Sequence, residues 1–382
     1  MRAVSLREIA ALFLKLGCTA FGGPAAHIAL MEEEVVRRRQ WLSHEQFLDL
    51  LSATNLIPGP NSTEMALHIG RCRAGWAGLV VAGLAFVAPA TALVTGMAWA
   101  YVRFGQLPQV AGLLSGIKPV MMAVVGQALW GLGRIVARDR MRALIAVGAA
   151  LLNMAGLHEL VVLFGAGIGG WVAARAGRFR RSGAPSCWCV LAAIGLPPIA
   201  ATAPAAVGAP LSLTTLFLFF LKVGSVLFGS GYVLLAFLRA DLVERWHWLT
   251  ESQLLDAVAV GQVTPGPLFT TATFIGYVLR GPLGAILATV GIFLPAFILV
   301  AMSGPFIPRW RASPGAAAFL DGVNAASLAL MAVVSLRLAA AALVDIWTIL
   351  LAALSAYFLI RHRVNSVWLI VAGGVIGLLR TW

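Results

Sequence analysis

The stretch LIPGPNSTEMALHIG, residues 56–70, interrupts an apolar, helix-forming segment with proline, glycine and proline. A proline inside a helix removes a backbone hydrogen bond and clashes with the preceding turn, so a helix must stop before Pro58 and restart after Pro60. The stretch VTPGPLFTTATFIG, residues 263–276, repeats the interruption at 265–267. Two copies of one break indicate a feature that the fold uses.

The two breaks belong to a repeat that runs along most of the chain. FLKLGCTAFGG at 13–23 matches FLKVGSVLFGS at 220–230, which pairs Lys15 with Lys222 at an offset of 207 residues (222 − 15). The offset becomes 206 after the Pro-Gly-Pro triplets. This match predicts two homologous domains, 1–175 and 212–382, joined by the linker 176–211. Whether 188–204 crosses the membrane stays open, because Pro197 and Pro198 would break a helix there.

The composition is that of a membrane protein. Of 382 residues, 60% are hydrophobic and 11% are charged, and the mean hydropathy is +0.90, whereas soluble domains carry about 25% charged residues. Several apolar runs approach the roughly 20 residues that cross a bilayer core as a helix. We expect an all-α polytopic, multi-pass protein in a lipid bilayer, with the number of spans left open. The runs are 75–102, 108–133, 143–156 with 159–174, 212–229, 281–303, 316–341, 345–360 and 364–379.

The net charge of +13 comes from arginines gathered in loops, so we expect no nucleic-acid partner. Cytoplasmic loops carry an excess of Lys and Arg, which places the basic loops of the first half in the cytoplasm if 43–70 dips into the membrane and returns. The basic tips of the second half fall on the opposite side of the repeat, which predicts inverted halves. The first-half loops are 37–39, 71–73, 134–142 and 175–181, and the second-half tips are Arg309, Arg311, Arg361 and Arg363. We expect no cleavable signal peptide, because Lys15 interrupts the first apolar stretch.

Each half contains another break besides its Pro-Gly-Pro. AFGGPAAH at 20–27, with Gly22 and Gly23, is matched by LFGSGYV at 227–233, with Gly229. Irregular backbone at membrane depth is tolerated only where it is buried in protein or lines a cavity. Paired interruptions in inverted repeats point to the substrate site of a transporter. Whether 20–24 is a re-entrant tip or a crossing is left open.

The Pro-Gly-Pro breaks carry residues that suit an anion. A helix N-terminus presents unpaired N–H groups and a partial positive charge, so two of them from opposed halves would form a cage for a tetrahedral oxyanion. Asn61 or Ser62 could cap the first restarting helix, with Asn61 and Glu64 at the spacing of a capping box. The alternative is a tight turn at the membrane surface. The predicted substrate-binding residues at the breaks are Gly22, Gly23, Asn55, Pro58, Gly59, Pro60, Asn61, Ser62, Gly229, Gln262, Pro265, Gly266, Pro267, Thr270 and Thr271.

Three lysines in apolar surroundings complete the predicted set. Lys15 and Lys222 occupy matched positions, and Lys118 has Asn324 as its counterpart. A lysine within a membrane segment costs ~2.5–3.5 kcal/mol on insertion scales and is a candidate for function. The alternative is that each side chain snorkels to the interface.

Proton coupling is predicted at His27, Glu64 and His68, which the second half lacks. Histidine titrates near neutral pH, and carboxylates and histidines form proton relays in membrane transporters. The alternatives are that His68 meets lipid headgroups beside Arg71 and that Glu64 only completes a helix cap.

The sequence predicts neither an enzyme nor a cofactor. It contains no metalloprotease, nucleophile-elbow or P-loop motif. Cys187 and Cys189 form a C-x-C in the linker without a nearby Cys or His to complete a metal site, so we predict no metal.

The chain contains FGGPAAHIALMEEEVV, Trp41 and NLIPGPNSTEMALHIG, with the second-half echoes LFGSGY and VTPGPLFTTATFIGY. In these residues it resembles the chromate ion transporter family in its long, two-domain form. The resemblance implies an inner-membrane carrier that exports chromate with the proton motive force, with sulfate as a structural analogue. The second half departs from the first at Gly229, Ser230 and Gly231, and at Leu268 in place of an asparagine.

Several alternatives stay open at the level of sequence. A related carrier could take up sulfate or another oxyanion, and a channel could use the Pro-Gly-Pro tips as a filter. A membrane enzyme acting on lipid or phosphate groups would need an acid–base pair near one interface, which the sequence does not supply. The oligomeric state is left open, with a homodimer as one candidate.

Overall fold

The computed structural model describes residues 4–21, 23–105, 107–180, 211–228, 233–303, 313–362 and 364–380. Every regular element in these ranges is a helix, and the two halves follow the same order. The first half contains α1 (Leu6–Thr19), α2 (Gly23–Glu32), the π-helix η1 (Glu33–Arg38), α3 (His44–Thr54), α4 (Asn61–Phe104), α5 (Pro108–Val136), α6 (Arg140–Met154) and α7 (Glu159–Arg180).

The second half contains α9 (Leu213–Val226), α10 (Leu234–Leu238), the π-helix η3 (Arg239–Arg245), α11 (Glu251–Val263), the 3-10 turn η4 (Leu268–Thr270), α12 (Thr271–Ser303), α14 (Pro314–Ala342), α15 (Ile346–Arg361) and α16 (Ser366–Arg380). Some predictions fall outside the described residues. These concern Gly22, Gly229, Cys187, Cys189, the linker segment 188–204, Arg309, Arg311 and Arg363.

Five helices among the described residues are long and apolar enough to cross a membrane. They are Asn61–Phe104, Pro108–Val136, Glu159–Ala176, Leu268–Ser303 and Pro314–Ala342. Large apolar side chains such as Trp76, Leu84 and Leu283 are exposed along them, as expected of surfaces that face lipid. The apolar run 212–229 is shorter than predicted as a helix, because α9 ends at Val226 where the glycine break begins.

α4 and α12 are each a helical hairpin. In α4 the backbone turns at Ala74 and Gly75, where Gly75 has a φ of +60°. A Cβ built on Gly70 would lie 2.3 Å from the carbonyl oxygen of Gly78, although eight residues of straight helix span about 12 Å. The short arm 61–73 therefore folds back on the long arm 76–104. α12 repeats this geometry, with a turn at Arg280 and Gly281 between the short arm 271–279 and the long arm 282–303.

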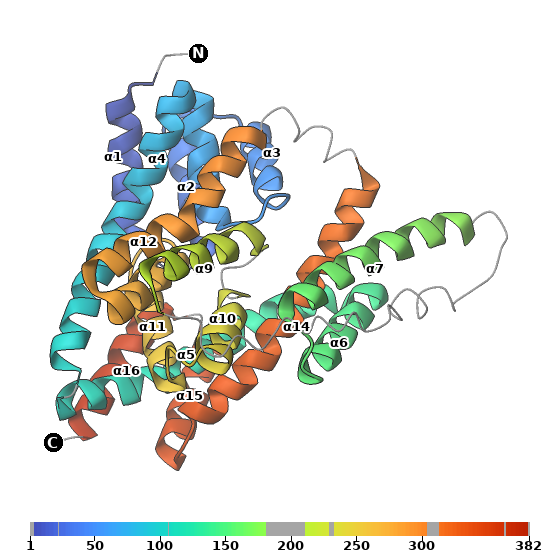
Figure 1. Ribbon diagram of the computed structural model, residues 1–382. Helices are drawn as coiled ribbons and strands as arrows, with labels where there is room; N and C mark the ends of the chain where they lie inside the picture. The colour runs from blue at the N-terminus through green and yellow to red at the C-terminus, as the bar shows by residue number, and fades with distance from the viewer. Residues whose placement is uncertain are drawn as a thin grey trace.

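The two long arms run in opposite directions. Arg71, at the outer end of the first short arm, donates to the carbonyl oxygen of Val300 near the end of the second long arm. Gly83 and Phe297 touch along the same contact, and α4 crosses α12 in the upper left of Figure 1. The end of one long arm thus lies beside the start of the other.

The re-entrant hairpins also enter from opposite ends. Arg73, at the outer end of the first short arm and next to the start of the long arm, donates to the carbonyl oxygen of Trp41 just before α3. Tyr101, near the end of that long arm, donates to Asp256 on α11 at 2.9 Å. α3 and α11 are equivalent helices of the two repeats, so the repeats are inverted, as the arginine pattern predicts. The start of α3 lies in space beside the outer end of the short arm, because Trp41 accepts from Arg73. The segment 43–70 therefore runs inward along α3 and returns along the short arm, as predicted.

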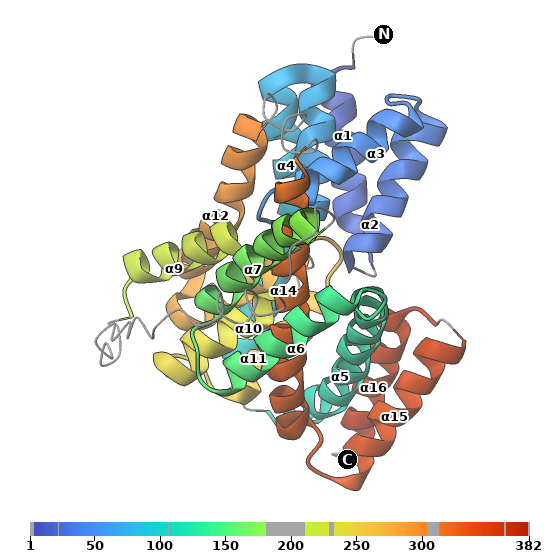
Figure 2. The ribbon, with the colours of Figure 1, turned by 90° about the vertical axis from the view of Figure 1, so that its right-hand side faces the viewer.

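The repeats exchange their last helices. α6 and α7 of the first repeat pack on α14 of the second, and α15 and α16 of the second pack on α5 of the first (Figures 1 and 2). Glycines allow close approach at both contacts. A Cβ on Gly322 would lie 2.2 Å from the carbonyl oxygen of Ala166, and one on Gly116 would lie 1.9 Å from that of Gly373. The exchange makes one core from both halves.

Candidate functional site

The two kinds of break meet across the repeats. The amide of Gly59 donates to the carbonyl oxygen of Leu227 at 2.7 Å, and the amide of Gly266 donates to that of Ala20 at 2.9 Å. Each Pro-Gly-Pro therefore joins the glycine break of the other repeat. Inversion thus brings unlike breaks together in two cross-repeat break pairs. A cage formed by both Pro-Gly-Pro tips stays a prediction.

Both break pairs lie against the middle of a long arm. A Cβ on Gly266 would lie 2.9 Å from the Cβ of Ala90, the midpoint of 76–104, and one on Gly59 would lie 3.3 Å from the Cβ of Ala296. The close packing of α1 against α4 at Gly17, beside the carbonyl oxygen of Phe86, holds the glycine break at the same level. The breaks are therefore level with the central parts of the long arms, which favours a buried site over a turn at the membrane surface.

Both central glycines are required by geometry. Gly59 has a φ of +146° and Gly266 a φ of +97°, a region that L residues rarely adopt. A Cβ on Gly59 would also lie 2.3 Å from Oε1 of Glu64. No other residue fits either position without local rearrangement.

The first break pair has an uncapped helix start. Pro60 is the N-cap of α4 and has no side-chain cap. The predicted capping box is wrong, because Asn61 is already the first helical residue, and its Nδ2 donates to Oδ1 of Asn55 at 2.9 Å instead. The first helical bond at this end is made by the amide of Glu64 to Pro60. The amides of residues 61–63 precede it and are the orphan donors of a helix N-terminus.

The second break pair is built differently. Thr270 Oγ1 donates to the carbonyl oxygen of Pro267 at 2.9 Å, and Thr271 Oγ1 donates to that of Leu268 at 2.8 Å. These two hydroxyls are thus donors to their own backbone, and η4 replaces a regular helix start. His27, which is buried, places Nε2 3.1 Å from the carbonyl oxygen of Ala20.

A small cavity lies in the second break pair. It offers about 10 Å³ to the centre of a water-sized molecule, which is room for about one water. Its lining includes Gly23, Pro24, His27, Gln262, Thr264 and Gly266. The cavity is smaller than a four-oxygen anion in this conformation.

Buried polar atoms without a hydrogen-bond partner gather at the two break pairs. They are Nδ1 of His27, Oδ1 of Asn61, Oγ1 of Thr63, both carboxyl oxygens of Glu64 and Nε2 of Gln262, with Nε2 of His68 one turn further along α4. Most buried polar groups in proteins have a partner. These exceptions make the paired breaks a candidate for binding a polar ligand. Thr63 was not predicted, and its position beside Ser62 in the first turn was the available signal.

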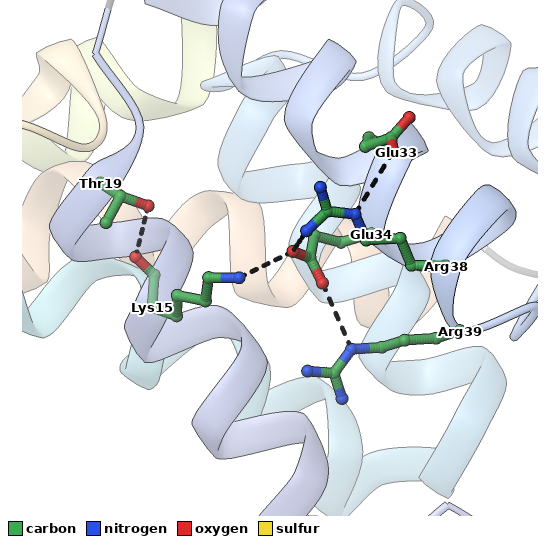
Figure 3. A network of polar contacts seen from close by, with 6 residues as sticks. All are labelled: Lys15, Thr19, Glu33, Glu34, Arg38 and Arg39. Carbon is green, nitrogen blue, oxygen red and sulfur yellow. Dashed lines mark hydrogen bonds and ion pairs between the residues drawn. The ribbon is translucent and has the colours of Figure 1, made fainter.

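The matched lysines are each paired with a carboxylate. Lys15 Nζ is 2.8 Å from Oε1 of Glu34 on η1, and the same carboxylate contacts Arg38 at 3.2 Å and Arg39 at 3.5 Å (Figure 3). Lys222 Nζ is likewise 2.8 Å from Oδ2 of Asp241 on η3.

The offset of 207 that pairs the lysines also pairs their acids, 34 with 241, and this signal was missed in the sequence. Each lysine ties the first helix of its repeat to a π-helix, so its charge is paired with a carboxylate in this structure. A role for Lys15 and Lys222 in substrate binding stays a prediction.

Lys118 also has partners. Its Nζ is 2.9 Å from Oδ1 of Asp256 and donates to Oγ of Ser252 at 2.8 Å. Asp256 is buried and accepts from Tyr101 as well. The group joins α4 and α5 of the first repeat to α11 of the second. Lys118 therefore neutralises a buried carboxylate at the outer part of the second hairpin.

A second cavity, larger than the one in the second break pair, is apolar. It holds about 400 Å³ and lies between α7 and α14, with Leu56 and Phe228 at the end next to the first break pair. Its walls are formed by side chains such as Trp171 and Phe319. An ion without polar partners is costly in such surroundings, so this crevice is not a site for an anion.

Two inverted helical repeats with paired breaks at the middle of long helices form the architecture found in inverted-repeat transporters. The chain belongs to the chromate transporter family, whose model matches residues 7–171 and 214–378. It is 32% identical to the chromate transport protein of Cupriavidus metallidurans over 374 residues, which are 97% of this chain and 92% of that protein.

Two further relatives cover nearly the whole chain. The chromate transport protein of Pseudomonas aeruginosa is 32% identical over 390 residues, with 98% of this chain and 92% of that protein covered. The probable chromate transport protein of Synechococcus elongatus is 29% identical over 387 residues, with 99% and 96% covered. No solved structure matches the chain.

Proposed function

We propose that this protein exports chromate across the inner membrane and thereby confers chromate resistance. The observation that carries the proposal is the group of unpartnered, buried polar atoms at the cross-repeat break pairs. Membership of the chromate transporter family supports chromate as the substrate. Sulfate, another tetrahedral dianion, is the expected analogue.

The first break pair supplies the main anion contacts. The amides of residues 61–63 at the start of α4 donate to the oxyanion, and the hydroxyl of Thr63 adds a side-chain donor. The positive end of the helix favours a negative charge there. A tetrahedral ion faces these donors with two of its oxygens, and its other two oxygens face the glycine break of the second repeat. There Leu227 contributes only a carbonyl oxygen, which already accepts from the amide of Gly59.

Transport proceeds by alternating access. The long arms cross in opposite directions, so rocking one repeat against the other opens the break pairs to one side and then to the other. Expelling a dianion from a cell that is negative inside is already favoured by about 2.3 kcal/mol per charge per 100 mV. A proton returned through His27 or Glu64 resets the carrier and links export to the proton motive force.

Everted membrane vesicles test this function, because export becomes uptake in them. Radiolabelled chromate and sulfate are supplied with and without an imposed pH gradient, to vesicles holding the wild type or a Pro58→Ala/Pro265→Ala double variant. We expect gradient-dependent chromate accumulation in the wild type and its loss in the double variant, with equal amounts of inserted protein. Gly96→Ala is the matched control, since a Cβ there meets nothing within 4 Å.

Accumulation of sulfate with none of chromate would overturn the substrate. Movement of sulfate into intact cells would instead support an uptake carrier. Flux that does not saturate and ignores the pH gradient would favour a channel.

A further inference from the structure

The apolar crevice between α7 and α14 takes no part in the proposed function. It holds about 400 Å³, within the roughly 300–1,000 Å³ of small-molecule sites. Both helices contain candidate membrane spans, Glu159–Ala176 and Pro314–Ala342, so the crevice lies at membrane depth. Two of its lining side chains, Ile168 and Trp171, are 51% and 40% exposed on the surface of a span. The crevice therefore opens towards lipid, and its occupant comes from the bilayer.

The walls of the crevice suit a hydrocarbon chain. Ile168 and Trp171 line it from α7, Phe319 lines it from α14, and Leu56 and Phe228 close its inner end. An ion or a polar group would find no hydrogen-bonding side chain there and would be costly to bury. Empty space would forfeit the van der Waals contacts of these walls. An acyl chain is the component of a bilayer that fills such a space.

The outer end of the crevice carries a positive charge. Arg175 lies one turn beyond Trp171 on α7, with its guanidinium carbon 4.8 Å from the centre of the Trp171 ring. The side chain is exposed and has no carboxylate partner among the described residues. Arginine recognises phosphate through its fixed fork of donors, and tryptophan is enriched where a membrane meets water. The mouth of the crevice therefore suits a phosphate headgroup.

α14 begins at the same end of the crevice. Its first residue is a proline, and Ser313 Oγ accepts from the amide of Ala316 at 3.4 Å. The amide of Gly315 is therefore the donor left at this helix start. Gly315 lines the crevice, and a Cβ built on it would lie 2.9 Å from Nε1 of Trp171. The amide, the indole N–H and the positive end of a 29-residue helix thus join Arg175 at the mouth.

The inner end of the crevice reaches the first break pair. Phe228 follows Leu227, whose carbonyl oxygen accepts from the amide of Gly59. Leu56 belongs to the segment that leads from α3 into the same Pro-Gly-Pro. A chain packed on Leu56 and Phe228 therefore supports both backbone segments that this hydrogen bond joins.

We propose that an anionic phospholipid occupies this crevice, with one acyl chain between α7 and α14 and its phosphate at Arg175. The loop 175–181 is predicted to be cytoplasmic, so the lipid belongs to the cytoplasmic leaflet. Its second chain stays in the bilayer, on the open side of the crevice. Basic pockets between membrane helices on this side bind anionic headgroups in the same way. The charge of the lipid stays at the mouth, and its chain forms part of the wall behind the first break pair.

Photolabelling of the full-length protein tests the inference. The protein is reconstituted in phosphatidylcholine vesicles that contain a small share of photoreactive lipid, either phosphatidylglycerol or phosphatidylcholine, with a diazirine at the end of one acyl chain. After irradiation the adducts are mapped by peptide mass spectrometry. Labelling of Leu56 and Phe228 reports the crevice, and labelling of Leu84 and Leu283, which are exposed on the long arms, reports the surrounding lipid.

We expect both probes to label the long arms equally and phosphatidylglycerol to label the inner end of the crevice about fivefold more than phosphatidylcholine, the effect of one arginine near a membrane surface. Arg175→Gln should remove this preference, whereas Arg361→Gln, at the exposed end of α15, should keep it. Ala316→Phe fills the crevice from α14 and should abolish labelling of its inner end by both probes. Ala317→Phe, on the exposed side of the same turn, is the matched control.

Adducts confined to the long arms of the folded wild type would overturn the inference, whether or not Ala316→Phe folds. Equal labelling of the inner end by the two probes would overturn the choice of an anionic lipid, and a preference that persists in Arg175→Gln would overturn the headgroup site. None of these results depends on which ion is carried. Wild-type vesicles that show the expected adducts but accumulate no chromate would overturn the proposed function and leave this inference standing.

Discussion

Gly59 donates its amide proton to the carbonyl oxygen of Leu227, a residue 168 positions further along the chain (227 − 59), at 2.7 Å. The equivalent bond runs from Gly266 to Ala20 with the repeats exchanged. Each repeat therefore holds the Pro-Gly-Pro of the other. Half of the site cannot exist alone, because each break is completed by backbone from the opposite repeat.

Replacing Gly59 with alanine should abolish transport. The new Cβ would lie 2.3 Å from Oε1 of Glu64, and the φ of +146° is unfavourable for alanine. We expect chromate accumulation in everted vesicles to fall more than about tenfold, since strain of this kind costs roughly 1–3 kcal/mol at the site. Gly96→Ala should match the wild type. Normal transport by Gly59→Ala would show that the described geometry of the break is not the working one.

Cysteines placed at Ser43 and Thr250 should be labelled from opposite sides of the membrane. These residues cap α3 and α11, the equivalent helices that enter from opposite ends of the long arms. In a background without native cysteines, an impermeant maleimide added to intact cells should label Thr250→Cys and spare Ser43→Cys. Labelling of both from one side would contradict the inverted arrangement. The two caps are matched, so any loss of helix stability affects both variants alike.

The lysine pairs should act on stability and leave substrate binding intact. Lys15→Met and Glu34→Gln are expected to destabilise the detergent-purified protein singly, with a coupling energy of about 0.5–3 kcal/mol in the double variant. The coupling falls towards the low end of that range if Lys15, whose side chain is 53% exposed, is well screened by solvent. The double variant should still accumulate chromate. Transport lost in every Lys15 variant, stable or not, would support Lys15 as part of the substrate site.

A leucine at Gly322 should separate α7 from α14. A Cβ at this position meets the carbonyl oxygen of Ala166 at 2.2 Å, and overpacking of a close contact costs about 1–3 kcal/mol. Thermal unfolding in detergent should show a lower midpoint for Gly322→Leu. Gly165→Leu on α7, where a Cβ has open space, is the control, and equal midpoints for the two variants would contradict the described packing.

The sequence was sufficient for the fold class and for the repeat. Prolines and glycines at fixed offsets locate the breaks without any tertiary information, and arginines in loops report the inversion because insertion is sensitive to charge. The predicted dip and return of 43–70 already implied that the short arm of α4 runs back towards the side from which α3 enters. The predicted apolar runs 75–102 and 281–303 correspond to the long arms, whereas the turns at Ala74–Gly75 and Arg280–Gly281 that fold the short arms back on them were not predicted.

Which breaks meet could not be predicted, since that depends on how the inverted repeats pack. The lysines show the same limit. Lys15 in an apolar stretch suggests a ligand, and only the structure shows Glu34, 19 residues away, beside it. Glu64 was assigned to a capping box by its spacing, but the helix begins one residue earlier than that assignment requires. A shift of one residue turns a satisfied cap into a buried carboxyl group without a partner.

The exchange of the last helices bears on how the protein is made. α6 and α7 leave the ribosome long before α14, the helix on which they pack. During synthesis the face of this pair that later contacts α14 must stay exposed in the bilayer. It remains exposed until the part of the second half that precedes residue 314 has been inserted. A nascent chain that stalls in this interval presents an unfinished surface to quality control. Assembly therefore completes from the C-terminal side, when α15 and α16 close over α5.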